Sequence, residues 1–454
     1  MKTATVLRNE IFNRVRLDSS FYLSEGNRAY RLVESALRTV PEHYSMGDKD
    51  LVRIWQPNRN VLIYAGAGEP STPYLQPYDI LEYLPGARSF ISQNQNPISE
   101  LKVNSGTILQ TCSGRNLGPL IISDKYLEQF AFGSDLLRID IFDESAKYYI
   151  FAFLNTWIGQ ALLHSNKTGS VIDHLSAKDI ENIRVPVFDK DVYNTVVDKM
   201  KLSFQLFSGA RISLEKSMKS FQAAVSINPD SLRLCEGWNV SAKDFCRSKR
   251  IDAAFFDPSV GMVSKRLLAD GGSTLSEVAD ILKPSGRYKT NYVKKEFGQP
   301  ILSGRQLLQN QIVGLKYLPK AAMESFADYR LSAGWIAYPA DGRVEGRLGT
   351  PIMVTQSRDG WYASGHVGRI VPHPNVDPGY VYLAVSHPAV QAQICSLACG
   401  SVVDAVYPED VEKITIPAKI DFPYEQIIDA WNDLDKANRL KEEACSLLLS
   451  CFQT

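Results

Sequence analysis

The sequence predicts an α+β protein in which two tandem copies of one mixed α/β domain are combined with two long helices. Three observations support this prediction. The chain of 454 residues is too long for one ordinary hydrophobic core and favours two or three domains. Its second half repeats the first half in register. A long segment with heptad spacing of apolar residues follows each copy.

The repeat is clearest between residues 132–186 and residues 363–417, which align without a gap 231 positions apart. Upstream the register shifts by a few residues, as insertions in surface loops produce. Gly, Pro, Asp and Arg recur in the same order in both copies, for example in Arg138-Ile139 and Arg369-Ile370, Gly169-Ser170-Val171 and Gly400-Ser401-Val402, Pro186 and Pro417, and Arg16-Leu17-Asp18 and Arg250-Ile251-Asp252. We therefore expect homologous domains at residues 1–186 and 228–417.

Each copy is expected to alternate short strands and helices. The first copy should open with an extended segment at Arg16–Leu23, followed later by strands near Gly106–Thr111 and Leu136–Phe142. Apolar residues at helical spacing predict a helix over Tyr148–Leu163. Ser176 and Asp179 have the spacing of a capping box at the start of a short helix. The unit should end in an edge strand at Ile183–Pro186, because proline lacks a backbone donor.

Residues 187–227 and 418–454 are predicted to be spacer helices. Their apolar seams are formed by Met200, Phe204, Phe207, Leu214, Met218, Phe221 and Val225, and by Ile427, Ala430, Leu434, Ala437, Ala444, Leu448 and Cys451. Each helix could pack on its own domain, or the two could pair as an antiparallel, pseudo-twofold coiled coil that separates the domains. Pairing is favoured because the helices occupy equivalent places and can cover each other's seams. An unbroken helix over residues 191–225 would span roughly 50 Å, which equals the length of about 15 base pairs of duplex DNA.

The composition excludes several classes of protein. Hydrophobic residues at 44% and charged residues at 22% are typical of a globular chain, and no apolar run is long enough to cross a bilayer. The N-terminus has no signal-peptide pattern, and the seven cysteines are scattered, so a cytoplasmic protein is expected. Lys plus Arg equals Asp plus Glu at 50 each. This balance counts against a free nucleic-acid binder, although a neutral total can conceal a basic face.

The sequence contains no pattern that predicts catalysis, a cofactor or a metal. It has no G-x-x-x-x-G-K-[ST] phosphate loop, and its histidines and cysteines lack the spacing of metal ligands. Val61–Gly68 is similar to a strand entering a glycine-rich turn, but a lone G-x-G is a weak signal for a cofactor. We expect neither catalytic residues nor a bound cofactor.

The order and duplication of diffuse motifs resemble the specificity (S) subunits of type I restriction-modification systems, over essentially the whole chain. In the first copy these motifs are Ser105-Gly106-Thr107-Ile108-Leu109, Ser113-Gly114-Arg115, Gly169–Ser176 and Ile183-Arg184-Val185-Pro186. In the second copy they are Ala333-Gly334-Trp335-Ile336, Asp341-Gly342-Arg343, Gly400-Ser401-Val402-Val403 and Ile414-Thr415-Ile416-Pro417. The second copy departs from the common pattern at Val403–Pro408.

The resemblance implies that each copy is a target-recognition domain that reads one half of a bipartite site in double-stranded DNA. It also implies that the helices dock methyltransferase subunits, two in number, and that some complexes add a restriction subunit. Adenine methylation and any cleavage then belong to those partner chains, and this chain is not an enzyme. We assign the seam residues Met200, Phe204, Phe207, Leu214, Met218, Leu434 and Leu448 to partner binding.

Candidate DNA contacts lie in polar, glycine-bounded loops. Arginine can pair with guanine and asparagine with adenine, while lysine, serine, threonine and backbone N–H groups bind phosphates. The candidates are Arg115, Asn116, Asn166, Lys167, Thr168, Gly169, Ser170, Arg287, Lys289, Arg343, Arg347 and Ser401. The alternative interpretation of these loops is ordinary solvated connections. Arg138 and Arg369 lie in strand-like segments and are expected to form structural ion pairs.

Two other functions remain open from the sequence. The chain could read DNA within a different phage-defence assembly, or it could be a protein–protein scaffold without DNA binding. The neutral charge supports the scaffold. A salt-dependent affinity for DNA separates the DNA readers from the scaffold, because phosphate contacts release counterions. Copurification with an adenine methyltransferase separates the two kinds of DNA reader.

Overall fold

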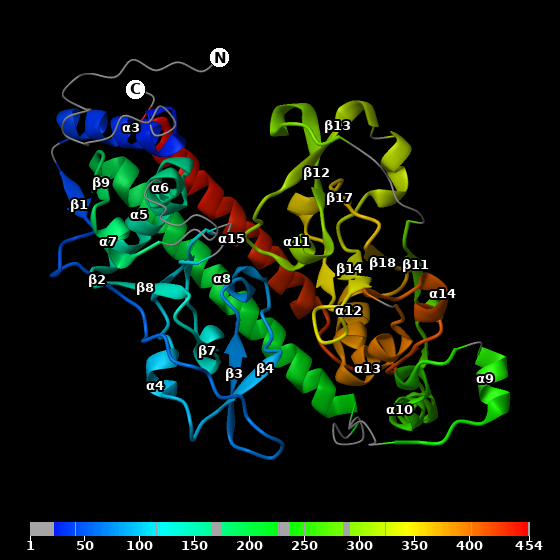
Figure 1. The fold of residues 1–454 in the computed structure, drawn as a ribbon. Coiled ribbons are helices and arrows are strands. Elements are labelled where there is room, and N and C mark those ends of the chain that lie inside the picture. The colour runs from blue at the N-terminus through cyan, green and yellow to red at the C-terminus, as the bar shows by residue number, and fades with distance from the viewer. Residues whose placement is uncertain are drawn as a thin grey trace. The chain divides into compact units, whose positions relative to one another are not determined.

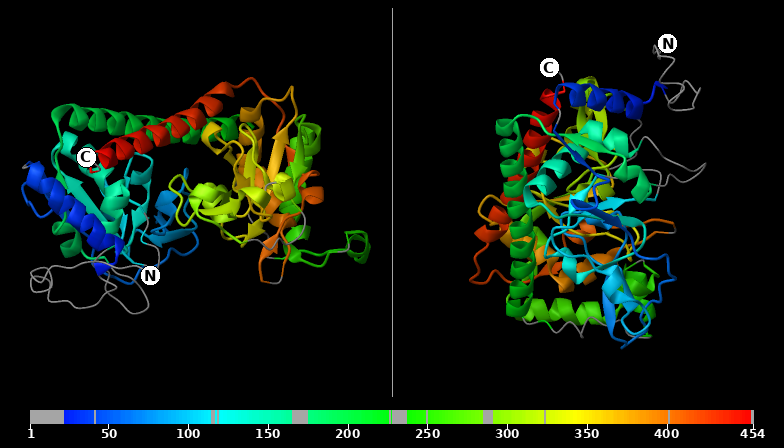
Figure 2. Two further views of the ribbon diagram at one scale, coloured as in Figure 1. Left: turned by 90° about the horizontal axis from the view of Figure 1, so that it is seen from above. Right: turned by 90° about the vertical axis from the view of Figure 1, so that its left-hand side faces the viewer.

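The computed structural model describes residues 22–40, 42–113, 117, 119–164, 175–225, 227, 237–248, 250–284, 291–322, 324–400 and 402–452. The chain divides into two compact units, which we call the first unit (Met1–Ser208 with Lys436–Thr454) and the second unit (Gly209–Asp435). Two long helices, α8 (Lys190–Val225) and α15 (Glu425–Ser450), each contribute one part to either unit (Figures 1 and 2). Within the described ranges, no helix combines the length and apolar character that crossing a membrane requires.

The first unit is built on two sheets. A four-stranded antiparallel sheet has the order β2-β8-β5-β6, formed by β2 (Val52–Trp55), β8 (Leu136–Ile141), β5 (Ile108–Thr111) and β6 (Ile121–Ile122). A three-stranded sheet has the order β4-β3-β7, formed by β4 (Ser89–Ser92), β3 (Ser71–Leu75) and β7 (Ala131–Phe132), with β3 and β7 parallel. A separate pair joins β1 (His43–Ser45) to β9 (Arg184–Pro186). The helices of this unit include α3 (Glu25–Thr39), α4 (Ile98–Leu101), α5 (Glu144–Asn155), α6 (Trp157–Leu163) and α7 (Ala177–Glu181), with 3₁₀ turns at Asp79–Leu81 and Leu127–Gln129.

The second unit repeats this strand order. Its four-stranded sheet runs β11-β18-β14-β16, formed by β11 (Ala279–Leu282), β18 (Val367–Pro372), β14 (Ile336–Pro339) and β16 (Ile352–Met353). Its three-stranded sheet runs β13-β12-β17, formed by β13 (Lys316–Pro319), β12 (Gly298–Leu302) and β17 (Tyr362–Ala363). Two further pairs join β10 (Ser273–Thr274) to β20 (Thr415–Ile416) and β15 (Asp341–Gly342) to β19 (Asp404–Ala405). The helices include α9 (Ala242–Ser248), α10 (Pro258–Ala269), α11 (Gly304–Leu308), α12 (Pro378–Ser386), α13 (Pro388–Leu397) and α14 (Pro408–Val411), with 3₁₀ turns at Ala253–Phe256, Leu275–Glu277, Lys295–Phe297, Lys320–Ala322, Glu324–Tyr329 and Gln356–Arg358.

A fully buried arginine joins the two sheets of each unit. In the first unit Arg138 of β8 donates to the carbonyls of Phe132 (2.9 Å) and Leu136 (3.0 Å). It also donates to the carbonyls of Leu101 and Gly133, each at 3.4 Å. Its guanidinium also lies 5.1 Å from the ring centroid of Trp55. Phe132 belongs to β7, so the guanidinium bridges the four-stranded and three-stranded sheets.

Arg369 of β18 makes the same connection in the second unit. It donates to Ala363 O of β17 at 2.8 Å, to Tyr329 O at 2.7 Å and to Val367 O. The predicted ion pairs of Arg138 and Arg369 are therefore wrong, although the structural role is confirmed. Backbone carbonyl oxygens, rather than carboxylates, accept the hydrogen bonds of the two guanidinium groups. Burial lowers the pKa of each arginine to about 10, which still leaves the side chain charged near neutral pH.

The helix predicted over Tyr148–Leu163 is interrupted at Thr156, which separates α5 from α6. The Thr156 hydroxyl accepts the Gly159 N–H at 3.1 Å and begins the second helix. A side chain at Gly159 would clash with the Phe153 carbonyl, so glycine is required for this close turn. The second unit breaks at the equivalent residue, His387, between α12 and α13. The Nδ1 atom of His387 accepts the Ala389 N–H at 3.1 Å and replaces the threonine as the cap.

Most other elements follow the sequence prediction. The strands β5 and β8, the capping box at Ser176 and the strand β9 are confirmed. The helix α8 continues without a break through Gly209. The expected strand at Val61–Gly68 is wrong, because Tyr64 forms just an isolated bridge with Ile91. The expected extended segment at Arg16–Leu23 lies outside the described residues up to Phe21.

In the first unit α8 packs beside α15, and in the second unit α8 packs against the segment just before α15. In the first unit Met200, Ala444 and Leu448 belong to the same hydrophobic core. The Ser203 hydroxyl donates to Ala437 O at 2.7 Å, and Lys199 pairs with Glu443 at 2.6 Å. In the second unit the ring of Phe221 contacts Phe422 at 5.7 Å and Tyr424 at 6.3 Å. The helices are thus part of the core of each unit.

Replacing Arg369 with methionine should lower the free energy of unfolding by about 2–4 kcal/mol, because the carbonyls between the sheets lose their donors. Urea unfolding followed by circular dichroism measures this change. Arg266→Met is the matched control, since Arg266 is exposed on α10 and forms a surface pair with Asp270. The control should change stability by less than about 0.5 kcal/mol. Equal effects of the two substitutions would contradict the bridging role.

Acid should destabilise the protein through His387. The side chain is 3% exposed and its Nε2 atom has no hydrogen-bond partner among the described residues. Burial lowers the pKa of His387 from 6.5 to about 4. Because the folded-state pKa lies below the unfolded one, stability is full above about pH 6.5 and is lost as the pH falls toward 4. Between about pH 7 and pH 5 the loss from this group should be about 2 kcal/mol. His387→Thr, the residue at the equivalent position of the first unit, should reduce this loss in unfolding measured at both pH values; an unchanged pH dependence would contradict it.

Candidate nucleic-acid interface

Three segments with predicted DNA contacts converge in the second unit. Lys283 directly follows β11 and precedes the basic run that contains Arg287. Its ammonium donates to Asp341 Oδ1 of β15 at 2.6 Å and to Val406 O at 3.2 Å. The strand β15 pairs with β19, which follows the Gly400-Ser401 segment. The ends of three loops that are distant in sequence therefore meet at one place.

A cluster of charged and aromatic side chains fixes this meeting point. Asp341 Oδ2 contacts His366 Nδ1, and the ammonium of Lys283 lies 5.2 Å from the ring centroid of Tyr407. The side chains of Lys283 and Asp341 are 11% and 18% exposed. Their ion pair is largely shielded from water, which strengthens it relative to a surface pair. The cluster can hold the described ends of these loops in place.

The first unit forms the equivalent junction with different side chains. Leu175 N–H donates to Cys112 O at 2.9 Å, and at the corresponding positions Val406 N–H donates to Ala340 O at 2.9 Å. The hydroxyl of Ser113 donates to Asp135 Oδ1 at 2.9 Å, at the positions that Asp341 and His366 occupy in the second unit. Both units thus join the segment after β5 or β14 to the segment after α6 or α13.

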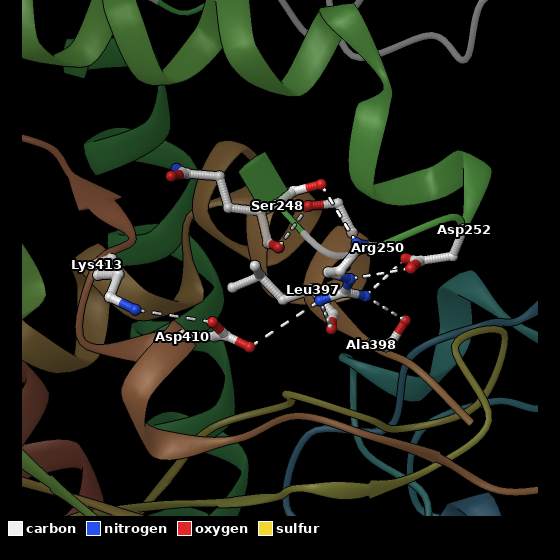
Figure 3. A network of polar contacts seen from close by, with 9 residues as sticks. Ser248, Arg250, Asp252, Leu397, Ala398, Asp410 and Lys413 are labelled. Carbon is white, nitrogen blue, oxygen red and sulfur yellow. Dashed lines mark hydrogen bonds and ion pairs between the residues drawn. The ribbon is translucent and has the colours of Figure 1, made fainter. Parts of the chain in front are cut away.

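Arg250 fixes the end of α13 from which the Gly400-Ser401 segment leaves (Figure 3). Its guanidinium forms a fork with Asp252, at 2.9 Å from Nε and 2.6 Å from Nη2. The same guanidinium donates from Nη1 to Leu397 O at 2.9 Å and from Nη2 to Ala398 O at 3.4 Å. These carbonyls lie at the C-terminal end of α13, where a positive charge is favourable.

The Arg250 side chain also ties other parts of the second unit to this point. Its Nη1 lies 4.0 Å from Asp410 Oδ2 of α14, and its guanidinium lies 4.5 Å from the ring centroid of Phe255. The hydrogen bonds to Asp252 raise the pKa of Arg250, so the charge persists at all ordinary pH values. The segment before α10, the end of α13 and α14 are therefore held by one side chain.

The predicted DNA-contact residues are described in part. Arg343 is exposed and Arg347 half-buried in the turn after β15, where Val344 N–H donates to Asp404 Oδ2 at 3.2 Å. The remaining candidates lie outside the described residues: Arg115, Asn116, Asn166, Lys167, Thr168, Gly169, Ser170, Arg287, Lys289 and Ser401. The described flanks of their loops nevertheless converge within each unit.

The residues that the sequence assigned to partner binding lie in the helix seams. Met200, Leu214, Leu434 and Leu448 are at most 1% exposed, and Phe204, Phe207 and Met218 are half-buried. The first four side chains are covered by this chain itself, so a partner subunit would contact other residues of the helices. Leu202 and Ile212 lie on α8 and are each 40% exposed, which makes them better candidates.

Sequence reasoning missed Lys283, His366 and Tyr407 as parts of the site. Their contacts link positions as far apart as Lys283 and Val406, and no local pattern reports such a link. Arg250 had a signal, because its Arg-x-Asp motif recurs as Arg16-Leu17-Asp18 in the first copy. Among the residues that the structure describes, no group of three or more His, Cys, Asp or Glu is placed to hold a metal ion.

Comparison with known proteins finds similar solved structures, but no match among protein families or curated sequences. No family model matches the chain, and no curated protein matches it. Similar solved structures include the S subunit of a type I restriction-modification system from M. genitalium, at 13% identity over 90% of this chain and 93% of that one, with a TM-score of 0.30. They also include the HsdS subunit from Thermoanaerobacter tengcongensis, at 12% identity over 88% and 96%, with a TM-score of 0.27. The type IIG restriction endonuclease BpuSI shares 11% identity over 43% of this chain and 30% of its own, with a TM-score of 0.31. The first two neighbours are in the class that the sequence resembles.

Loss of the Arg250 fork should loosen the segment that follows α13. We expect Arg250→Gln to increase amide hydrogen exchange across residues 396–405 by roughly 10-fold or more, because this corresponds to about 1.4 kcal/mol of lost local stability. Exchange measured by mass spectrometry checks this, with the exposed and neighbouring Arg247→Gln as the control. Unchanged protection of residues 396–405 would show that Arg250 does not position this segment.

Proposed function

We propose that this chain is the sequence-specific DNA-recognition subunit of a type I restriction-modification system. It would read a bipartite target and leave methylation and cleavage to partner subunits. The observation that carries the proposal is the duplication. The repeat in the sequence coincides with a repeat of strand order, of the buried arginine and of the loop junction in two units. Two equivalent readers in one chain suit a target with two separated halves.

The loop junctions support a role in recognition. Each unit gathers loop ends onto a scaffold that is braced by two sheets, which is how binding residues are commonly presented. The loops are polar, and the described Arg343 is exposed and able to pair with guanine or phosphate. The junction of the first unit uses Ser113 and Asp135, whereas the second uses Asp341 and His366. This difference suits two domains that read different half-sites.

The two long helices support the proposal that a spacer separates the recognition domains. They pack beside one another in the first unit, and α8 has 36 residues, a length of roughly 50 Å. We infer an antiparallel, pseudo-twofold coiled coil formed by residues 187–227 and 418–454, with recognition domains at residues 1–186 and 228–417. Such a spacer would set the length of the unread gap between the half-sites.

The exposed apolar residues of α8 support docking of methyltransferase subunits. Four of the seven seam residues assigned to partner binding are buried within the chain, yet Leu202 and Ile212 still present apolar surface. We propose that two methyltransferase subunits bind along the helices and that a restriction subunit joins in complexes that cleave. The target adenine would be flipped out of the duplex by the methyltransferase, since the reaction needs access to its amino group.

Expression together with the neighbouring methyltransferase gene, followed by mapping of methylated adenines across the host genome, tests this function. A bipartite motif with a fixed gap is expected. Exchange of residues 1–186 for those of a chain with another motif should change one half of the motif and leave the other half intact. Absence of such a motif, together with no binding of the chain to duplex DNA at low salt, would instead favour the protein–protein scaffold that the net charge of zero allows.

A further inference from the structure

We propose that a basic surface on the second unit, formed by Lys294, Lys295, Lys316 and Tyr292, contacts the phosphate backbone of duplex DNA outside the loop junction. We call it the hairpin surface, because it lies on the antiparallel pair β12–β13 and the chain just before β12 (Figure 1). This inference rests on the proposed function and adds a second contact region for the same ligand.

The backbone brings the three lysines together. Val293 forms an antiparallel bridge with Tyr317, and its N–H donates to Tyr317 O at 3.0 Å. Lys294 directly follows Val293 and Lys316 directly precedes Tyr317, so this bridge brings the two lysines onto neighbouring lengths of chain. The Lys316 ammonium also lies 4.5 Å from the ring centroid of Tyr292. The hairpin surface therefore holds its cations on neighbouring lengths of chain, with Lys316 on β13 and Lys295 in the 3₁₀ turn before β12.

The cations of this surface are not neutralised within the described chain. Lys294, Lys295 and Lys316 are exposed, and none of them forms an ion pair with a described carboxylate. The neighbouring carboxylate, Glu296, is exposed as well. Unpaired like charges on neighbouring lengths of chain repel one another. A bound polyanion would relieve this repulsion.

The first unit shows that the fold does not require these lysines. It has the same strand pairing in β3–β4, but Ser89 occupies the register position of Lys316. Ala67 and Gly68 stand at the positions of Lys294 and Lys295, 227 residues earlier. Tyr64 and Phe90 are 56% and 50% exposed there without an adjacent lysine. The positive charge therefore distinguishes the second unit, and packing does not explain it.

The residues of this surface are better suited to contacts with the DNA phosphate backbone than to contacts with individual bases. Lysine presents a compact point charge that binds phosphate, whereas base reading relies mainly on the paired donors of arginine and amide side chains. The exposed rings of Tyr292 (46%) and Phe297 (66%) lie next to the lysines in the sequence and can cover sugar groups. The hairpin surface should thus add affinity and salt dependence to both specific and non-specific binding, with little effect on sequence preference.

The test compares the full-length parent, in complex with its methyltransferase partner, with a Lys294→Gln, Lys295→Gln, Lys316→Gln variant. Binding to a target duplex and a random duplex is measured by fluorescence anisotropy over a range of salt concentrations. Each lost phosphate contact should reduce the slope of log K against log salt by about 0.9, so a reduction of roughly 2–3 is expected. Affinity at low salt should fall about 10-fold or more and by the same factor for both duplexes.

The control variant carries Lys125→Gln, Lys243→Gln and Lys265→Gln, which removes three exposed lysines outside the hairpin surface. It should keep the slope of the parent. Thermal unfolding of both variants checks that the exposed substitutions leave the fold intact.

An unchanged slope in the hairpin variant, or an equal change in the control, overturns the inference. Normal DNA binding combined with loss of the methyltransferase also overturns it, because the surface would then bind an acidic protein. A parent complex without salt-dependent DNA binding would contradict the proposed function itself.

Discussion

The structure of each unit depends on one buried guanidinium that satisfies the carbonyl groups where two sheets meet. Arg369 bridges β18 to β17 and to the turn at Tyr329, and Arg138 repeats this bridge. Backbone carbonyls at such a junction cannot pair with a neighbouring strand, and leaving them unpaired away from water is costly. Arginine suits the position because it carries five donors in a rigid plane and stays charged even though burial lowers its pKa to about 10. This contact ties the two sheets of each unit together where they meet.

The braced sheets make the loop junction possible. Because the strands leave each sheet at fixed positions, loops that are separated by more than a hundred residues begin and end close together, as the bond from Lys283 to Val406 shows. The units differ in the side chains that close the junction, with a hydroxyl–carboxylate pair in one and a Lys283–Asp341 ion pair in the other. One framework can therefore carry two different sets of loops. Arg250 adds a second brace at the end of α13 in the second unit.

The distribution of charge reconciles a net charge of zero with a proposed DNA ligand. Total charge governs solubility and long-range behaviour, whereas phosphate binding depends on local clusters whose cations are not already paired. Many basic residues of this chain are engaged internally: Arg138 and Arg369 bind carbonyls, and Arg250 binds Asp252. The lysines of the hairpin surface are not engaged in this way. The two units would then contribute unequally to binding DNA.

The sequence by itself determined the duplication, the α+β class, the central strands, the capping box at Ser176 and the length of α8, because these depend on local periodicity and on spacing along the chain. It did not determine the helix break at Thr156, the carbonyl partners of Arg138, or the contact of Lys283 with Asp341. It also placed the seam residue Met200 on a partner surface, whereas the fold buries it against α15. Each of these features is set by which distant segments pack together, and a single sequence carries no direct signal of that packing. The tertiary structure alone decided which charged side chains face one another and which face outward.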